Sequence, residues 1–182
     1  MLEAAIKYKE QLEKLHYNTW FNDKYKYWVC DVYHDSITID TNTWNKHQFV
    51  SVSNGEVIGY ISYNIDRGDN SITSLSAINF SDNKITFGMD LGKALQDIFE
   101  KYRFRKISFS VIIGNPIEKS YDKMIKKYGG SIVGIRKKHV KLIDGLYYDQ
   151  KLYEILESEY SYFKETVETI GIGSNDVMMS AT

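Results

Sequence analysis

The residues best placed to do chemistry lie in one stretch, Lys106–Tyr128. Ile107, Phe109 and Val111 alternate with serines, which predicts a strand with one buried face, and Gly114-Asn115-Pro116 ends it. Apolar residues at helical spacing follow. An asparagine-bearing turn between a strand and a helix suits a ligand, because the amides at a helix N-terminus point at whatever sits there. The same pattern is also half of an ordinary α/β unit.

Other residues could do chemistry by type alone. Asp66, His47 and His139 could each act as a general base, but nothing in the sequence directs them to a site, and exposed surface positions explain them equally. Cys30 and His34 are four residues apart, but two ligands do not make a zinc site. We therefore predict no metal centre.

Composition excludes several classes of protein. The 182 residues carry a formal net charge of −1, which does not indicate binding to nucleic acid or to an anionic membrane. Cys30 is the single cysteine, so no internal disulfide can form, and a reducing cytoplasm is the expected compartment. No apolar run is long enough to span a bilayer, and the N-terminus is too charged for a signal peptide. We expect one domain over residues 1–169, followed by a mobile tail over 170–182.

Turn signals and periodicity give an order of elements that predicts a mixed, mostly antiparallel sheet with helices packed on it, an α/β (α+β) fold. Asn54-Gly55 and Asp144-Gly145 each predict a β-hairpin. The predicted helices are Leu2–Leu15, a short helix within 17–44, Asp90–Tyr102, Pro116–Tyr128 and a short helix from Glu157 to about Thr169. The predicted strands are His47–Ser53, Glu56–Ile65, Ser71–Phe80, Lys106–Ile113, Ser131–Ile143 and Leu146–Leu156.

This order, with these turns, resembles the GNAT superfamily of acyl-CoA-dependent N-acetyltransferases. The resemblance covers about 49–156 and rests on an ordered set of short segments: LGKAL (Leu91–Leu95), Asn115, Tyr121, KKYGG (Lys126–Gly130) and GLYYDQKLYEIL (Gly145–Leu156).

The resemblance implies a path for acetyl-CoA as co-substrate. The pantetheine arm would pair with the end of the strand Ser71–Phe80, at Asn79, Phe80 and Ser81. The pyrophosphate would bind at the start of the next helix, which is a favourable place for negative charge. Asn115 would contact the pantetheine amides or cap the helix that follows it. Tyr121 would protonate the departing CoA thiolate, or would simply pack in the core beside Ile125 and Tyr128.

The sequence departs from the family at the pyrophosphate loop, which usually reads Arg/Gln-x-x-Gly-x-Gly/Ala. Aligned on LGKAL, the loop here is Phe87, Gly88, Met89, Asp90, Leu91 and Gly92, followed by Lys93. Phe87 replaces the basic or amide residue, and Asp90 replaces the first glycine. A carboxylate at this position would act as the helix N-cap and would repel a phosphate by about 1 kcal/mol or more. Gly88, Lys84 and Lys93 could offset that repulsion.

Two functions follow from the resemblance. The first is an N-acetyltransferase that transfers an acetyl group from acetyl-CoA to a primary amine of a small molecule or peptide, by direct attack on the thioester. The alternative is a protein of the same fold that has lost catalysis and acts as a binding or assembly module. The retained Asn115, Tyr121 and Gly92 favour the enzyme, and the altered loop favours the alternative. In either case the chain could form a homodimer.

Overall fold

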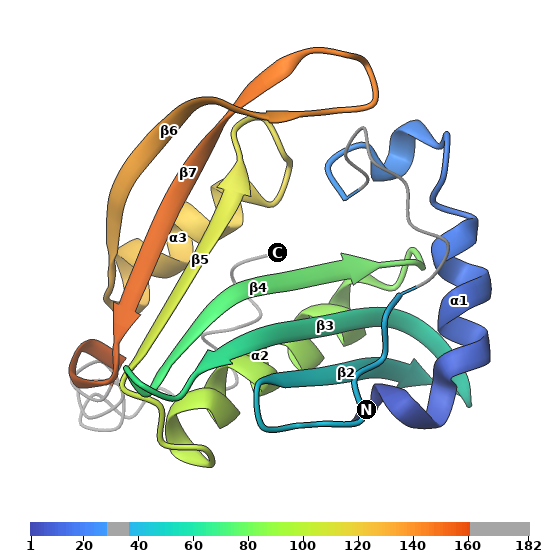
Figure 1. The fold of residues 1–182 in the computed structure, drawn as a ribbon, viewed down its shortest axis with the longest axis horizontal. Helices are drawn as coiled ribbons and strands as arrows, with labels where there is room; N and C mark the ends of the chain where they lie inside the picture. The colour runs from blue at the N-terminus through green and yellow to red at the C-terminus, as the bar shows by residue number, and fades with distance from the viewer. Residues whose placement is uncertain (29–36, 161–182) are drawn as a thin grey trace.

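The computed structural model describes residues 1–28 and 37–160. Its centre is a seven-stranded mixed sheet in the order β1-β2-β3-β4-β5-β7-β6 (Figure 1), which confirms the predicted fold class. In chain order the elements are β1 (Leu2–Ala4), the 3-10 turn η1 (Ala5–Tyr8), α1 (Lys9–Tyr17), the 3-10 turn η2 (Asp23–Tyr25), β2 (Lys46–Ser53), β3 (Glu56–Asp66), β4 (Ser71–Asn79), α2 (Lys84–Glu100), β5 (Lys106–Ile112), α3 (Glu118–Tyr128), β6 (Ser131–Lys141) and β7 (Tyr147–Leu156).

Both predicted hairpins are confirmed. Asn54 and Gly55 have φ values of 52° and 81°, the two positive angles that a type I′ turn requires between β2 and β3. Gly145, with φ 79°, closes the turn between β6 and β7, where its N–H donates to the Leu142 carbonyl. Strands β2, β3 and β4 form an antiparallel meander, and β5, β7 and β6 form a second antiparallel group.

The predicted helix over Leu2–Leu15 is wrong at its start. Residues Leu2–Ala4 form β1, which pairs antiparallel with β2 and sets Leu2 opposite Ser51. A sheet edge offers backbone partners to a whole segment, and this outweighs the weak helical periodicity of a few residues. The helix α1 follows a 3-10 turn and buries Leu12. In the 17–44 region the structure has the turn η2, and residues 29–36, which include Cys30 and His34, lie outside the described part of the chain.

Helix α2 begins six residues before its predicted start, Asp90. The Asn83 side chain accepts the Thr86 N–H at 3.1 Å, so Asn83 is the N-cap and Asp90 is an interior residue of the helix. The additional turn buries Phe87, whose ring packs against Gly59 on β3. Helix α3 begins at Glu118, two residues after its predicted start. The helix expected from Glu157 has helical residues at 157–160; its remainder and the 170–182 tail lie outside the described residues.

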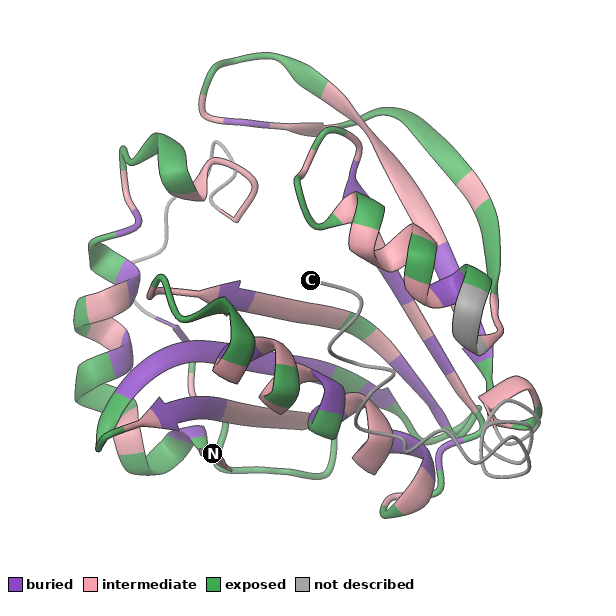
Figure 2. Ribbon diagram, turned by 180° about the vertical axis from the view of Figure 1, so that it is seen from behind, coloured by how far each residue is buried: buried purple, intermediate pink, exposed green. Residues whose placement is uncertain are grey.

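The sheet has a core on each face. Helices α2 and α3 cover one face and bury Tyr63, Ile98, Phe109 and Tyr153 among others. On the other face, α1 stands at one end of the strands beside a second core that includes Val50, Tyr60 and Ile78 (Figure 2). Strand β3 is buried on both faces from Val57 to Tyr63. No helix in the described part of the chain is long and apolar enough to cross a membrane.

Gly59 fixes how closely α2 approaches the sheet, and this generates a stability prediction. A Cβ atom at Gly59 would lie 2.3 Å from the Phe87 ring and 2.8 Å from the Ile78 carbonyl oxygen. We expect Gly59→Ala to lower the free energy of unfolding by about 1–3 kcal/mol, as overpacking does. Gly88→Ala is the matched control: a Cβ there meets nothing within 4 Å. Because Gly88 lies in the interior of α2, Gly88→Ala should raise the free energy of unfolding by up to about 1 kcal/mol. Urea denaturation measures both, and a Gly59→Ala protein as stable as wild type would contradict this packing.

Candidate active site

The central sheet opens between β4 and β5. These strands are parallel and pair at two positions, Ser71 with Lys106 and Ile72 with Ile107. Beyond that point β4 continues to pair with β3, and β5 continues to pair with β7, as the two groups of strands diverge (Figure 1). Within the described residues, the β4 backbone beyond Ile72 therefore has no strand partner on the side of β5. We call this divergence the fork.

A β-bulge lies just beyond the apex of the fork. The register between β3 and β4 shifts so that Ser74 and Leu75 together oppose Tyr63. Ser74 is exposed and has φ 55°, an uncommon angle for a residue other than glycine. Bulges re-aim backbone groups and side chains, and they are frequent beside active sites. This bulge turns the β4 backbone at the point where its pairing with β5 ends.

The turn between β4 and α2 holds the first group of predicted site residues. Asn79 receives hydrogen bonds from the Ser81 N–H and hydroxyl, at 2.9 and 3.0 Å. The Phe80 N–H donates to the Ile58 carbonyl, and its own carbonyl accepts from the Tyr25 hydroxyl at 3.1 Å. The amides of Phe80 and Ser81 are thus already used within the protein. These hydrogen bonds hold the turn, which sets the first turn of α2 at the open end of β4.

The second predicted group, Gly88 to Lys93, lies inside α2 and is not a loop. Asp90 accepts a hydrogen bond from Ser51 of β2 at 2.5 Å, and Lys93 pairs with Asp97 at 2.5 Å. Asp90 and Lys93 both line a cavity of about 350 Å³ between α2 and the β1–β2 edge of the sheet. Met89 is exposed, Gly92 is buried, and Leu91 packs on the sheet. The carboxylate expected to repel phosphate instead holds α2 against β2.

Asn115 closes the turn between β5 and α3. Its side-chain oxygen accepts the Ile117 N–H at 3.1 Å, and its carbonyl accepts the Glu118 N–H at 2.9 Å. The Gly114 N–H donates to the Glu118 carboxylate at 2.9 Å. These hydrogen bonds stabilise the turn before α3, but Asn115 is not the helix cap, because the N-cap is Ile117 and makes no side-chain cap hydrogen bond. The side-chain NH₂ group of Asn115 has no described partner.

Tyr121 is held by its ring and not by its hydroxyl. The ring packs edge-on against Phe109 and Tyr153, with centroid separations of 5.2 and 6.0 Å. No described residue hydrogen-bonds its hydroxyl. Burial raises the pKa of Tyr121 to about 12, so the phenol is neutral at physiological pH and can donate a proton.

Beside Tyr121 lies a charged cluster that the sequence did not reveal. Lys151 of β7 pairs with Glu118 at 2.5 Å and with Asp122 at 2.9 Å, both on α3. The Tyr153 hydroxyl donates to Asp122 at 2.7 Å. The hydrogen bond from Lys151 lowers the pKa of Glu118. Burial opposes ionisation of Asp122, but its hydrogen bonds from Tyr153 and Lys151 outweigh burial and lower its pKa. The sequence signal for this cluster was its spacing. The two acids are four residues apart on α3, and the lysine and the tyrosine that face them are two residues apart on β7.

The face of β5 and β7 that points away from α3 carries polar side chains beside Ile112 and Leu152. Glu154 accepts hydrogen bonds from Lys106 at 2.9 Å and from Ser108 at 3.1 Å, and the Lys106 interaction lowers the pKa of Glu154. Further along, Gln150 donates to Ser110 at 3.0 Å. A polar molecule approaching the fork from this side would meet hydroxyls, an amide and one paired carboxylate.

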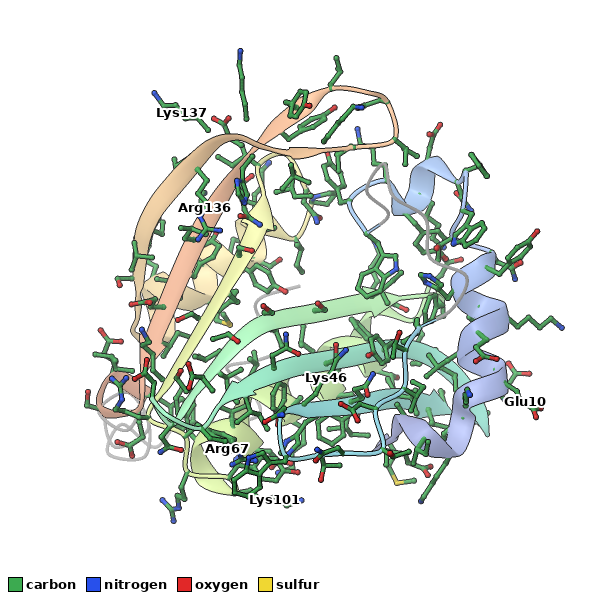
Figure 3. The ribbon with its side chains drawn as sticks, viewed as in Figure 1. Glu10, Lys46, Arg67, Lys101, Arg136 and Lys137 are labelled. Atoms are coloured by element: carbon green, nitrogen blue, oxygen red, sulfur yellow. The ribbon has the colours of Figure 1, made fainter. Side chains whose placement is uncertain are left out.

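The three general-base candidates do not meet at the fork. His47 of β2 lies 2.9 Å from the Tyr63 hydroxyl, and its burial, followed by nearby Arg67 and Lys101, lowers the pKa of His47. Figure 3 shows Arg67 and Lys101 together at that end of the molecule. Asp66 accepts the amides of Gly68 and Asp69 in a turn, and His139 is exposed on β6. In the described ranges, no three His, Cys, Asp or Glu side chains are grouped so that they could hold a metal ion.

Solved structures share this arrangement of elements. The chain is similar to spermidine N-acetyltransferase from Vibrio cholerae in complex with CoA and spermine, with 19% identity, a TM-score of 0.67, and coverage of 88% of this chain and 96% of that one. It is also similar to Mycobacterium smegmatis RimJ in complex with CoA-disulfide, with 20% identity, a TM-score of 0.52, and coverage of 63% and 55%. A probable acetyltransferase matches with 17% identity and a TM-score of 0.53 over 64% of each chain.

The last two matches span less than two thirds of the other protein's length. No protein-family model matches the sequence, and no curated protein is similar to it. The similarity to the solved structures shows that the chain has the fold of the GNAT acyl-CoA N-acyltransferases, as the sequence predicted.

The charged cluster predicts how stability depends on pH. Because the pKa values of Glu118 and Asp122 are lowered in the folded state, their contribution to stability is complete above their unfolded pKa values, near 4.5 and 3.8. It is lost as pH falls through the lower, folded values. Lys151→Met removes the cation, so the free energy of unfolding should fall less steeply as pH is lowered. Lys123→Met, at an exposed position on α3, is the control and should leave the curve unchanged. Equal acid sensitivity of wild type and Lys151→Met would contradict the role of the cluster.

Proposed function

We propose that this protein is an N-acetyltransferase, which transfers the acetyl group of acetyl-CoA to a primary amine by direct attack. The observation that carries the proposal is the fork, where two parallel strands pair at two positions and then separate. An extended ligand rich in amides needs an unpaired strand edge, and β4 offers one. Similarity of fold to an acetyltransferase bound to CoA and spermine supports the same reading.

The pantetheine arm would lie along β4 between Thr73 and Asn79, pairing with the unpaired backbone as an added strand does. The predicted contacts Asn79, Phe80 and Ser81 form the open end of this edge. Because the amides of Phe80 and Ser81 and the side chain of Asn79 already make hydrogen bonds within the protein, we expect the pantetheine arm to pair mainly with the β4 backbone before Asn79. Asn115, whose NH₂ group has no described partner, faces the same ligand from the β5 side in this proposal.

The pyrophosphate would bind at the first turn of α2. The amides from Gly88 to Lys93 belong to the helix interior, where they serve the helix itself. The positive end of the helix dipole lies at Lys84–Thr86, and the Lys84 side chain is exposed there. We therefore expect the phosphates to contact Lys84 and its neighbours, and not the predicted residues 88–93.

The reaction needs an oxyanion donor and a proton for the leaving group. The amine attacks the thioester carbonyl carbon, a C–N bond forms, and the carbonyl oxygen becomes negative. A backbone amide of the bulge at Ser74–Leu75 is a suitable donor to that oxygen. The C–S bond then breaks, and Tyr121 gives its proton to the thiolate, to be reprotonated later from solvent. Burial raises the pKa of this phenol. The same burial disfavours a charged thiolate beside it, and so favours transfer of the proton to the sulfur.

The acceptor would approach from the polar face of β5 and β7. A small-molecule amine is the acceptor class that the Vibrio cholerae structure supports, since that protein is a spermidine N-acetyltransferase, and a peptide amine is the alternative. On this face Glu154 supplies an ionised carboxylate that would attract a cationic amine, and the proton that the amine loses would pass to solvent. We expect the reaction to take place in the cytoplasm.

One observation favours a binding module without catalysis. At the start of α2 the Lys84 N–H donates to Asp82, and the Thr86 N–H donates to the Asn83 side chain at 3.1 Å. Amides that are already occupied bind phosphate weakly. If acetyl-CoA does not bind, the same fold would serve as an assembly or binding module.

Tyr121→Phe separates catalysis from packing. It keeps the ring between Phe109 and Tyr153 and removes a hydroxyl that has no described partner, so stability should change by less than about 1 kcal/mol. Turnover should fall by roughly 10²-fold with acetyl-CoA affinity near wild type, as expected for a general acid used in the transition state. Acetyl-CoA hydrolysis serves as the assay until an acceptor is known.

Tyr8→Phe is the control. It removes a hydroxyl that donates to Glu3 at 2.9 Å, on a ring that packs against the core on the other face of the sheet. Wild-type turnover in Tyr121→Phe would remove this residue from the catalytic group, while acetyl-CoA binding without any turnover in wild type would favour the binding module.

A further inference from the structure

The side of β5, β7 and β6 that points away from α3 carries a set of polar side chains, and we call this side the acceptor face. The register sets Ser108 of β5 opposite Glu154 of β7, and Arg136 of β6 opposite Gln150 of β7. Residues directly opposite each other point to the same side of a sheet, and residues two or four apart on one strand do so too. Ser110 therefore joins these four on the acceptor face.

The acceptor face is turned toward the open end of the fork. Tyr148 lies two residues before Gln150 on β7, and the Lys26 Nζ atom lies 5.9 Å from the centroid of its ring. One residue before Lys26, the Tyr25 hydroxyl donates to the Phe80 carbonyl at the end of β4, at 3.1 Å. This short segment therefore reaches from the end of β4 to the acceptor face, and Figure 1 shows the end of the β6–β7 hairpin bending toward it. A molecule that enters the fork from this end meets the acceptor face.

Arg136 supplies an unmatched charge on the acceptor face. Glu154 pairs with Lys106 at 2.9 Å, whereas Arg136 is exposed and has no ion pair with any residue that the structure describes. Figure 3 shows Arg136 in front of β6 and β7, while Lys137 extends beyond the sheet. A guanidinium binds a carboxylate through two parallel N–H···O bonds, so an arginine without a partner on a binding face favours a carboxylate ligand.

Gln150 carries a second group that lacks a partner. Its Nε2 donates to the Ser110 hydroxyl at 3.0 Å, but its Oε1 is buried and accepts no hydrogen bond from the described part of the chain. Buried acceptors without a donor are rare, because each has given up a hydrogen bond that it would make in water. Since Arg136 is directly opposite Gln150, a ligand held by the guanidinium would bring its own N–H groups beside this acceptor.

From these observations, and resting on the proposed acetyltransferase function, we propose that the acceptor amine also carries a carboxylate. Arg136 holds the carboxylate, Gln150 accepts an N–H of the ligand, and the reacting amine lies toward Glu154 and the apex of the fork. Gln150 and Glu154 are four residues apart, which is about 13 Å along a strand, so several bonds separate the two ends of the ligand. An ω-amino acid or a short peptide has that length, and an α-amino acid is too short. A polyamine would bring a second cation to Arg136 and be repelled.

Acceptor selectivity tests the proposal. Release of the CoA thiol, with acetyl-CoA saturating, is measured for three amines of equal chain length that differ at one end. δ-Aminovalerate carries a carboxylate there, pentylamine a methyl group and cadaverine a second ammonium. We expect kcat/KM to be highest for δ-aminovalerate, at least about tenfold above pentylamine, as one charge-assisted hydrogen bond provides, and lowest for cadaverine. Glycylglycine, which adds an amide N–H for Gln150 at the same length, should equal or exceed δ-aminovalerate.

Variants locate the recognition. Arg136→Met should lower kcat/KM for δ-aminovalerate to that for pentylamine, with wild-type values for pentylamine and for acetyl-CoA affinity. Lys137→Met is the matched control, because this neighbouring cation extends beyond the sheet, and it should keep the wild-type preference. Both positions are exposed, so neither variant should shift the thermal unfolding midpoint. Gln150→Glu places a carboxylate opposite Arg136 and should move the preference toward cadaverine.

A wild-type preference for cadaverine or spermidine over δ-aminovalerate would overturn the proposal, as would equal losses in Arg136→Met and Lys137→Met. A preference for phosphoethanolamine would make the recognised anion a phosphate, and weaker acetyl-CoA binding by Arg136→Met would assign the arginine to the co-substrate. Each of these results overturns the carboxylate acceptor and leaves the acetyltransferase function standing. Absence of acetyl-CoA binding, with no transfer to any amine, would overturn the function itself and this inference with it.

Discussion

The structure depends on a short stretch of parallel pairing at the apex of the fork. Ile72 and Ile107 face each other there, both fully buried, in the core under α2 and α3. Backbone hydrogen bonds tie the same point from both sides: Arg105 donates to the Asn70 carbonyl, and Glu157 donates to the Arg105 carbonyl. Both groups of strands therefore start from this one point. Beyond it, β4 and β5 separate while the core around Ile72 and Ile107 stays intact.

The separation of β4 from β5 forms the candidate site and gives it two different walls. On the side of β4, the bulge at Ser74 and the hydrogen-bonded turn at Asn79 leave a rigid backbone edge. On the side of β5, the ring contacts of Tyr121 and the cluster around Lys151 lock α3 to β7. A ligand between the two would meet backbone groups on one wall and side chains on the other. This asymmetry would suit the proposed thioester substrate, whose carbonyl oxygen requires a hydrogen-bond donor and whose sulfur requires a proton.

The sequence predicted most of the fold because its turns are chemically explicit. Asn54, Gly55 and Gly145 adopt the positive φ angles that their hairpin turns need, and the apolar alternation of β5 can face only one core. It failed where partners distant in sequence decide the outcome. The short segment Leu2–Ala4 is a strand because β2 offers it an edge, and the first turn of α2, which the Asn83 side chain caps, packs Phe87 over Gly59.

The candidate site was predictable in its location more than in its contacts. The turn at Asn115 and the helix carrying Tyr121 were visible as a strand-to-helix unit, whereas the fork and the bulge result from register, which no local pattern encodes. Asp90 has the residue type of a helix N-cap, but the cap is Asn83, and the Asp90 carboxylate accepts a hydrogen bond from Ser51 inside α2. A lysine bridging two acids across α3 and β7 could not be found without the pairing of β5 with β7.

Calorimetric titration of acetyl-CoA into wild type, Lys84→Ala and Lys93→Ala tests the central claim most directly. Both lysines are exposed on α2, but Lys84 is at its first turn, and Lys93 pairs with Asp97 beside the cavity at the sheet edge. If the fork binds acetyl-CoA with its phosphates at the start of α2, wild type binds, Lys84→Ala binds several-fold more weakly, and Lys93→Ala matches wild type. Absence of binding by wild type at millimolar acetyl-CoA, or loss of affinity in Lys93→Ala with Lys84→Ala unaffected, would contradict it.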